Sequence, residues 1–176
     1  MSHQGFLSPN GRCFSFDHRA NGFARGEGVG TVIVKRLSDA LRDGDTIRAV
    51  VRGTGINQDG RTPGLTLPSS EAQERLIKTT YASAGLDFDD TMLVEAHGTG
   101  TRQGDAIEAR GIAQAFKSRR KDRPLYLGSI KASVGHLEGA AGVAGYVISS
   151  SGLIQAMEID QKLTFPCTEL SKVCWR

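Results

Sequence analysis

Apolar and β-branched residues gather in four short stretches that predict β-strands. Two come early, at residues 29–37 (VGTVIVKRL) and 46–57 (TIRAVVRGTGIN). Two more, at 91–97 (TMLVEAH) and 125–130 (LYLGSI), lie in the second half of the chain. The polar stretch 38–45 (SDALRDGD), between the first two, predicts a turn.

The first predicted helix begins beside Ser70 and Gln73, which resemble a capping box, and ends at Gly85. Apolar and small side chains recur every four residues along one of its faces, at Ala72, Leu76, Thr80 and Ala84. We therefore expect this face to be covered by other parts of the chain.

Two further helices are predicted, and they alternate with the later strands. Residues 104–120 (GDAIEARGIAQAFKSRR) have three expected buried positions, Ile107, Ala113 and Phe116. Residues 139–157 are rich in Gly, Ala and Ser, so this helix can pack close to its neighbours. Alternating strands and helices favour an α/β layered fold with a parallel or mixed sheet.

The remaining segments predict loops. Residues 8–28 mix turn formers with aromatic residues, and we expect Phe14, Phe16 and Phe23 to pin this loop to the core. Residues 57–68 form a long stretch rich in Gly, Pro and Asn, and loops of such length are often functional.

Composition narrows the class of protein. A chain of 176 residues that is 39% hydrophobic can bury one sizeable core, and its formal charge of +3 calls for no nucleic-acid or membrane partner. The basic run at 117–121 follows a predicted helix, which favours a solvated helix end.

The cysteine count and the absence of long apolar runs point to a reducing, cytoplasmic compartment. Cys13, Cys167 and Cys174 form an odd set without CxxC spacing, which supports neither a disulfide framework nor a zinc site. No apolar run approaches the roughly 20 residues that a membrane span needs, and the N-terminus lacks signal-peptide features.

Two histidines stand out as candidates for chemistry. His97, in EAHGTGT, and His136, in KASVGHLEGAAG, each follow a predicted strand or its turn. Functional groups gather at the carboxyl ends of strands in α/β folds, so both rings can face one crevice. Neutral imidazoles there can donate N–H to a developing oxyanion. The alternative is that both histidines have structural roles, as helix caps or core residues. A metal site formed by the pair is disfavoured, because no third ligand lies at a suitable spacing.

Polar residues surround both histidines. Thr99 and Thr101 offer hydroxyl groups beside flexible glycines, which suits hydrogen bonding to an amide-rich ligand arm. Asp105 and Glu108 are three residues apart and share a helix face, and Asp105 can cap that helix. A carboxylate on this face can hold Lys131, in a structural or a functional role.

At this point the two segments EAHGTGTRQGDAIEA and GSIKASVGHLEGAAGVAG strongly resemble the β-ketoacyl synthase (ketosynthase) domains of type I polyketide and fatty acid synthases. The upstream segments FSFDHRANGFARGEGVGTVIVKRL and GTGINQDGRTPGLTLPS resemble the same family, the latter its polyketide synthases in particular. The resemblance covers residues 1–145. It implies a thiolase-like layered fold, here the end of the N-terminal half and the start of the C-terminal half.

The resemblance also implies a reaction, the decarboxylative Claisen condensation of an acyl thioester with malonyl-acyl carrier protein. No bound cofactor is implied, because the carrier protein delivers the phosphopantetheine. The implied partners are the carrier protein, malonyl and acyl thioesters and other synthase domains of a homodimeric parent, with no nucleic acid, membrane or metal. Individual positions match the family's catalytic histidines (His97 and His136), its supporting polar residues (Lys131, Asp105 and Glu108) and its carrier-arm contacts (Thr99 and Thr101).

The same resemblance exposes a gap. The family's nucleophilic cysteine lies in a segment similar to DTACSSS, and no such segment occurs among these 176 residues. We therefore expect a partial ketosynthase domain at 1–145 that is inactive in condensation alone, with a non-catalytic remnant or a carrier-protein-binding module as the alternative. Residues 146–176 match nothing in the family and predict a divergent tail, with a translated intron, a frameshift or a genuine terminus as its possible origins.

Overall fold

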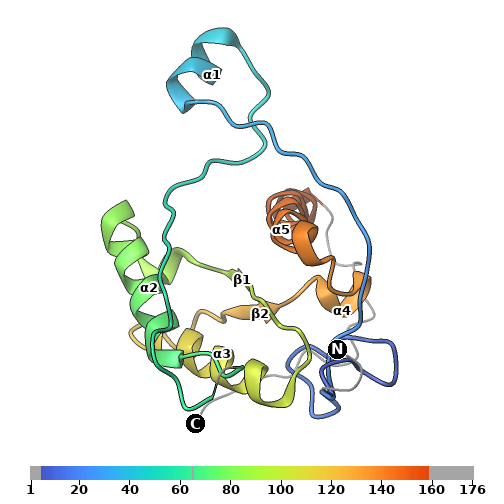
Figure 1. Cartoon of the computed structure of the whole chain (residues 1–176). Coiled ribbons are helices and arrows are strands. Elements are labelled where there is room, and N and C mark those ends of the chain that lie inside the picture. The colour runs from blue at the N-terminus through green and yellow to red at the C-terminus, as the bar shows by residue number, and fades with distance from the viewer. Residues whose placement is uncertain (1–4, 65, 159–176) are drawn as a thin grey trace.

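The computed structural model describes residues 5–64 and 66–158. At its centre two short parallel strands, β1 (Leu93–Glu95) and β2 (Tyr126–Gly128), pair in register (Figure 1). Both lie inside stretches that the sequence predicts as strands, and their parallel arrangement confirms the expected α/β fold.

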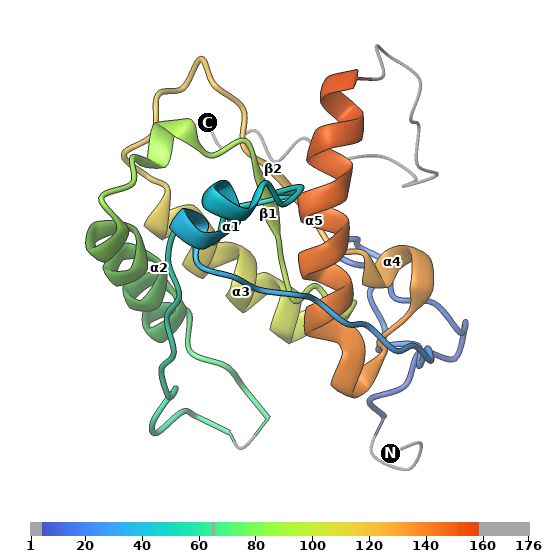
Figure 2. The same cartoon turned by 90° about the horizontal axis from the view of Figure 1, so that it is seen from above.

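Three helices flank this pair of strands. α2 (Ser70–Ala84) and α3 (Arg102–Ala115) pack against each other on one side of the pair, and α5 (Ala141–Glu158) lies on the other (Figures 1 and 2). The buried core between the strands and the first two helices consists of Ala96, Ile112, Ala115 and Phe116. All three helices were predicted, with boundaries that differ by a few residues.

Aromatic rings extend this core beneath η2 (Phe88–Asp90). Tyr81 stacks on Phe88 at 4.4 Å between ring centroids, and Phe116 meets both rings edge-on. Of the positions expected to be buried on α3, Phe116 is buried, whereas Ile107 and Ala113 are only half-buried. Ile112 and Ala115 are buried instead, because the helix face that packs toward α2 and β1 is rotated from the face that the sequence predicted.

The ends of α2 agree closely with the sequence. Gly85 adopts a left-handed conformation (φ 61°) and closes the helix, as predicted. The N-cap is Ser69 rather than Ser70, because the Ser69 hydroxyl accepts a hydrogen bond from the Ala72 N–H at 3.1 Å. Part of the predicted covered face is indeed covered: a Cβ at Gly53 or Gly55 would meet side chains of Leu76, Thr80 or Ala84 within 3.0 Å.

The two early strand predictions are wrong. Residues 29–36 and 46–57 contain no strand, and in Figure 1 they lead to and from α1 as extended stretches. Their contacts are with helices: a Cβ at Gly30 would meet Val143 of α5, and Gly55 lies close to α2. Val29, Ile33 and Ile56 are 98%, 96% and 94% exposed. A β-strand needs a partner for its backbone hydrogen bonds, and within the described residues these segments have none.

The predicted turn at 38–45 is instead the helix α1 (Leu37–Asp43), which stands away from the rest of the molecule (Figure 1). Arg42 forms an ion pair with Asp39 one turn earlier at 2.7 Å, and Gly44 ends the helix in a left-handed conformation. Local helix contacts therefore override the turn composition.

Between β2 and α5 the chain forms two short turns, α4 (Lys131–Val134) and η3 (Glu138–Ala140). The aromatic N-terminal loop lies against them: Arg25 and His136 form an isolated parallel bridge. The predicted divergent tail begins within α5, and its residues 159–176 lie outside the described part. Among the described residues, no helix is long and apolar enough to cross a bilayer.

Candidate active site

The structure brings the two histidines together. His97 follows β1 and His136 follows α4, and their rings meet edge-on with centroids 5.5 Å apart. The ring of Phe23 lies 5.5 Å from that of His136 on the other side. Because β1 and β2 are parallel, their carboxyl ends share one edge of the sheet, and the segments that carry both histidines start there.

Glu108 holds the loop that carries His97. Its two carboxylate oxygens accept hydrogen bonds from the backbone N–H groups of His97 (2.7 Å) and Gly98 (2.8 Å). Gly98 has a φ of 43°, and a Cβ there would lie 2.6 Å from the Cβ of Ser129. A glycine is therefore required for the loop to pass so close to the chain beyond β2.

Asp105, on α3, also fixes the loop that carries His97. The residue is 5% exposed, and its carboxylate accepts backbone hydrogen bonds from Phe16 at 2.7 Å, Gly100 at 3.1 Å and Thr101 at 3.2 Å. Burial raises the pKa of Asp105, and these hydrogen bonds oppose the rise. Asp105 thus joins the N-terminal loop to the start of α3. It accepts a hydrogen bond from the N–H of Thr101, the N-cap residue, and so does not cap the N–H groups of the first helical turn.

Thr99 and Thr101 lie on this loop with their hydroxyl groups 3.3 Å apart. Thr99 is buried and Thr101 is half-buried at the N-cap of α3, where its side chain makes no capping hydrogen bond. The structure thus places both threonines beside His97, and their expected contact with a carrier arm stays a prediction.

Lys131 is buried (5% exposed) at the start of α4. The predicted ion pair with Asp105 or Glu108 is absent from the described part of the chain, because both carboxylates bond to backbone N–H groups of the 97–101 loop instead. The positive charge of Lys131 therefore acts on the histidines and the nearby carboxylates through space.

Sequence reasoning missed Glu95, the last residue of β1. Its Oε1 accepts a hydrogen bond from the Ile130 N–H at 2.7 Å, directly before Lys131. Burial raises the pKa of Glu95, while this hydrogen bond and Lys131 oppose the rise. A carboxylate inside an apolar strand, two residues before a candidate catalytic histidine, was the available signal.

Both imidazoles favour the neutral form. Desolvation by the surrounding protein lowers the pKa of His97, and the charges of Lys131 and His136 lower it further. The Asp105 carboxylate acts in the opposite direction and raises this pKa. Desolvation also lowers the pKa of His136, with Lys131 acting in the same direction and Glu138 opposing. His97 nevertheless exposes part of its surface, so a neutral ring remains open to a substrate.

The tautomer of His136 follows from its neighbour. The backbone N–H of Glu138 donates a hydrogen bond to Nδ1 of His136 at 3.0 Å. A neutral ring that accepts at Nδ1 carries its proton on Nε2, which then becomes the donor toward a ligand. Glu138 reaches this position with a φ of 52°, uncommon for a residue other than glycine.

Cys13 lies close to this site but has the properties of a structural thiol. It is 3% exposed, its sulfur accepts a hydrogen bond from the Ala24 N–H at 3.1 Å, and burial raises its pKa. Cys167 and Cys174 lie outside the described residues. Within the described ranges, no group of three His, Cys, Asp or Glu side chains is placed to hold a metal ion.

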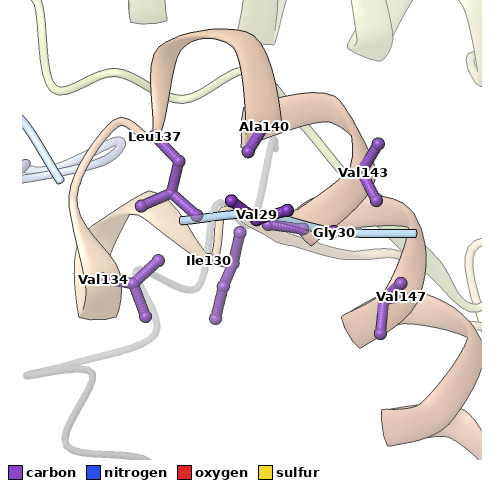
Figure 3. A pocket seen from close by; sticks show the side chains of 9 residues that line it. Val29, Gly30, Ile130, Val134, Leu137, Ala140, Val143 and Val147 are labelled. Atoms are coloured by element: carbon purple, nitrogen blue, oxygen red, sulfur yellow. The ribbon is translucent and has the colours of Figure 1, made fainter. Parts of the chain in front are cut away.

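An apolar cavity of about 260 Å³ lies next to the histidine site. Figure 3 shows its walls, which come from the extended segment at 29–30, from the chain between β2 and α5, and from the first turns of α5. Its lining is formed by small and branched aliphatic residues: Val29, Gly30, Ile130, Val134, Leu137, Ala140, Val143, Ala144 and Val147. Leu137 directly follows His136, so apolar surface begins beside the polar site.

An α/β fold that brings two imidazoles of lowered pKa together at the carboxyl edge of parallel strands is an arrangement suited to stabilising an oxyanion. Family models match almost the whole chain: "Beta-ketoacyl synthase, N-terminal domain" over residues 1–40 and "Beta-ketoacyl synthase, C-terminal domain" over residues 48–160. The chain belongs to the β-ketoacyl synthase family.

Individual relatives agree. The highly reducing polyketide synthase tazB of Aspergillus terreus is 56% identical over 158 residues, which cover 88% of this chain and 6% of the relative. The reducing polyketide synthase PKS1 of Cochliobolus heterostrophus is 58% identical over 149 residues, with 85% and 6% covered. The chain thus spans about 6% of the length of the curated relatives it matches.

Solved structures extend the similarity to the fold. A ketosynthase from module 6 of the bacillaene synthase of Bacillus subtilis 168 is 40% identical with a TM-score of 0.79, covering 90% of this chain and 28% of that one. An oxazolomycin ketosynthase domain of Streptomyces albus is 41% identical with a TM-score of 0.81, covering 88% and 26%. These neighbours confirm the thiolase-like fold and the ketosynthase resemblance.

Proposed function

We propose that His97 and His136 promote the malonyl half of a decarboxylative Claisen condensation in polyketide biosynthesis. The observation that carries this proposal is the edge-on contact of two neutral imidazoles at the carboxyl edge of β1 and β2. Two hydrogen-bond donors at one point suit an oxygen atom that becomes negative during a reaction.

The chemistry follows from these donors. The bond between the malonyl carboxylate and the α-carbon breaks, carbon dioxide leaves, and the electron pair delocalises as a thioester enolate. The Nε2–H of His136 and the ring N–H of His97 donate hydrogen bonds to the enolate oxygen. In condensation, the enolate carbon then attacks an acyl thioester and expels a thiolate. Without an acyl partner, the enolate carbon takes a proton from water.

The surrounding residues have supporting roles in this proposal. Desolvation is the main cause of the lowered pKa of both imidazoles, and the positive charge of Lys131 adds to it by opposing their protonation. Asp105 and Glu108 fix the loop that carries His97. Thr99 and Thr101 hydrogen-bond the phosphopantetheine arm that an acyl carrier protein delivers. The protein works in the cytoplasm, with other synthase domains, as part of a homodimer.

The acyl half of the reaction needs a nucleophilic thiolate. Cys13 is unsuited to this role, because burial raises its pKa and excludes an acyl donor. We therefore propose that residues 1–176 alone release carbon dioxide from malonyl thioesters without forming a new carbon–carbon bond. Binding of a carrier protein without chemistry is the alternative function.

Release of carbon dioxide from malonyl-pantetheine by the 176-residue chain tests this proposal. His97→Ala and His136→Ala should each reduce the rate about 100-fold, as loss of an oxyanion donor does in other enzymes. The control is His18→Ala, because the His18 side chain is 89% exposed, and it should retain the wild-type rate.

The pH dependence gives a second readout. Because desolvation lowers the pKa of both histidines from the ordinary imidazole value, the rate should fall only at a pH below that ordinary value, as the rings become protonated and lose function. Folded wild-type protein that binds a malonyl carrier protein but releases no carbon dioxide would favour the binding function instead.

A further inference from the structure

We propose that Glu95 is a positioning residue that fixes the start of α4 and thereby holds the buried Lys131, whose charge acts on the two histidines. This inference rests on the proposed function only in taking the histidine pair as the reactive centre. Glu95 itself contacts neither histidine ring in any hydrogen bond of the described residues, so it acts through the chain at Lys131.

The first step is a hydrogen bond between secondary-structure elements. Glu95 ends β1, and its Oε1 accepts the backbone N–H of Ile130 at 2.7 Å. Ile130 is the N-cap residue of α4, and Lys131 is its first helical residue. The N-cap residue Ile130 makes no side-chain capping hydrogen bond, and Ser129 Oγ accepts the Lys131 N–H at 3.4 Å. The Glu95 carboxylate, at 2.7 Å from the Ile130 N, is therefore the shorter of two side-chain anchors for the backbone at the beginning of α4.

The second step is the space in which this carboxylate lies. Gly145 of α5 is buried, and a Cβ at this position would lie 3.2 Å from Cγ and 3.5 Å from Oε1 of Glu95. The Glu95 side chain therefore occupies the junction of β1, α4 and α5. Such confinement limits the side chain to few rotamers and keeps its hydrogen bond to Ile130 in place.

The third step is the charge balance. Asp105 and Glu108 bond to the backbone of the 97–101 loop, and Lys131 is buried without an ion pair among the described residues. A further carboxylate that senses the Lys131 charge is the half-buried Glu95. Lys131 in turn lowers the pKa of both His97 and His136. The position of Lys131 is therefore a determinant of histidine protonation.

Other charged groups face the two rings and define the background. Asp105, on α3, raises the pKa of His97. Glu138, on η3, raises the pKa of His136, whereas Arg25 of the N-terminal loop lowers it. The negative charge of Glu95 favours a protonated imidazole, so its direct loss would lower the histidine midpoints, and a rise on its removal reports a change at Lys131.

The test is an NMR titration of the histidine rings in the full 176-residue chain. Glu95→Ala should release Lys131 toward solvent and raise the midpoints of His97 and His136 by about 0.5 pH unit or more. Lys131→Met should raise both midpoints similarly, and the double variant should show no further rise. Loss of a negative charge alone would lower these midpoints, so the sign of the change is diagnostic.

Two further variants complete the design. Glu95→Gln retains an oxygen acceptor for the Ile130 N–H and should leave both midpoints close to wild type. Glu138→Ala, the matched control, should lower the His136 midpoint and leave that of His97 unchanged. Unchanged or lowered midpoints in folded Glu95→Ala would overturn the proposal, as would rises in the double variant that exceed those of Lys131→Met. The measurement needs no substrate, so it stands even where malonyl decarboxylation fails.

Discussion

The strand β2 and the extended segment at residues 29–36 have similar short apolar, β-branched or aromatic patterns, but their outcomes differ. β2 pairs with β1, and the Leu127 side chain packs against the buried core. In the segment 29–36, Ile33 and Val34 are 96% and 76% exposed. A strand pattern indicates that a segment is able to pair and be buried. Whether it forms a strand depends on a neighbouring strand or helix that covers it.

The comparison also separates the site from its surroundings. The loop at 97–101 has no regular secondary structure, yet two carboxylates and two close glycine contacts fix its backbone. Residues 46–57 are equally irregular, and several of their large apolar side chains point to solvent. The loop of the candidate site is therefore held by contacts within the described residues.

The largest change in stability should come from a substitution in the buried core, compared with one in the exposed segment 29–36. Phe116→Ala removes a 7% exposed ring with two aromatic neighbours and should lower the free energy of unfolding by about 3–5 kcal/mol. Ile33→Ala should change it by less than about 0.5 kcal/mol. Urea unfolding followed by circular dichroism measures both. Equal losses would mean that the segment 29–36 is buried in solution, contrary to the structure.

A smaller effect is expected from the carboxylate beneath the site. Asp105→Ala leaves three backbone N–H groups without their acceptor, which should lower the free energy of unfolding by about 3 kcal/mol. Asp122→Ala is the control, because its side chain is 67% exposed and bonds only at the surface. The same urea experiment compares them, and similar losses would remove Asp105 from its role in fixing the loop.

The smallest effect should separate two glycines of α5. Gly142 has free space around its missing Cβ, so Gly142→Ala should stabilise the helix by up to about 1 kcal/mol. Gly145→Ala places a Cβ 3.2 Å from Glu95 and should be less stable than Gly142→Ala by about 1 kcal/mol. Thermal unfolding of the two variants provides the measurement, and equal stabilities would show that Glu95 is free to move.

Local rules predicted the later half of the fold well. The helices α2, α3 and α5, the strands β1 and β2 and the loop that carries His97 follow from periodicity, glycine stops and strand-end placement. The early strands failed because their outcome depends on partners, which no local pattern contains. α1 was missed because Asp39, Gly44 and Asp45 are typical turn formers, whereas here Gly44 ends a short helix in which Asp39 and Arg42 form an ion pair.

The sequence predicted which residues lie together at the candidate site, but not the hydrogen bonds that join them. His97 and His136 were found from motif and strand position, and the structure places their rings in contact. The Lys131–acid pair was wrong, because hydrogen bonds from backbone N–H groups compete for the same carboxylates. Glu95 was missed because its partner is a backbone N–H of Ile130, 35 residues further along the chain.

The hydrogen bond from Glu138 to His136 has a consequence for timing. A free imidazole exchanges its proton between two nitrogens and rotates about its bonds to the chain, and a catalyst that relied on such a ring would have to wait for the productive arrangement. Here the backbone has already selected one nitrogen as donor and one ring orientation. In the proposed function, the Nε2–H donor of His136 is thus oriented before an enolate forms.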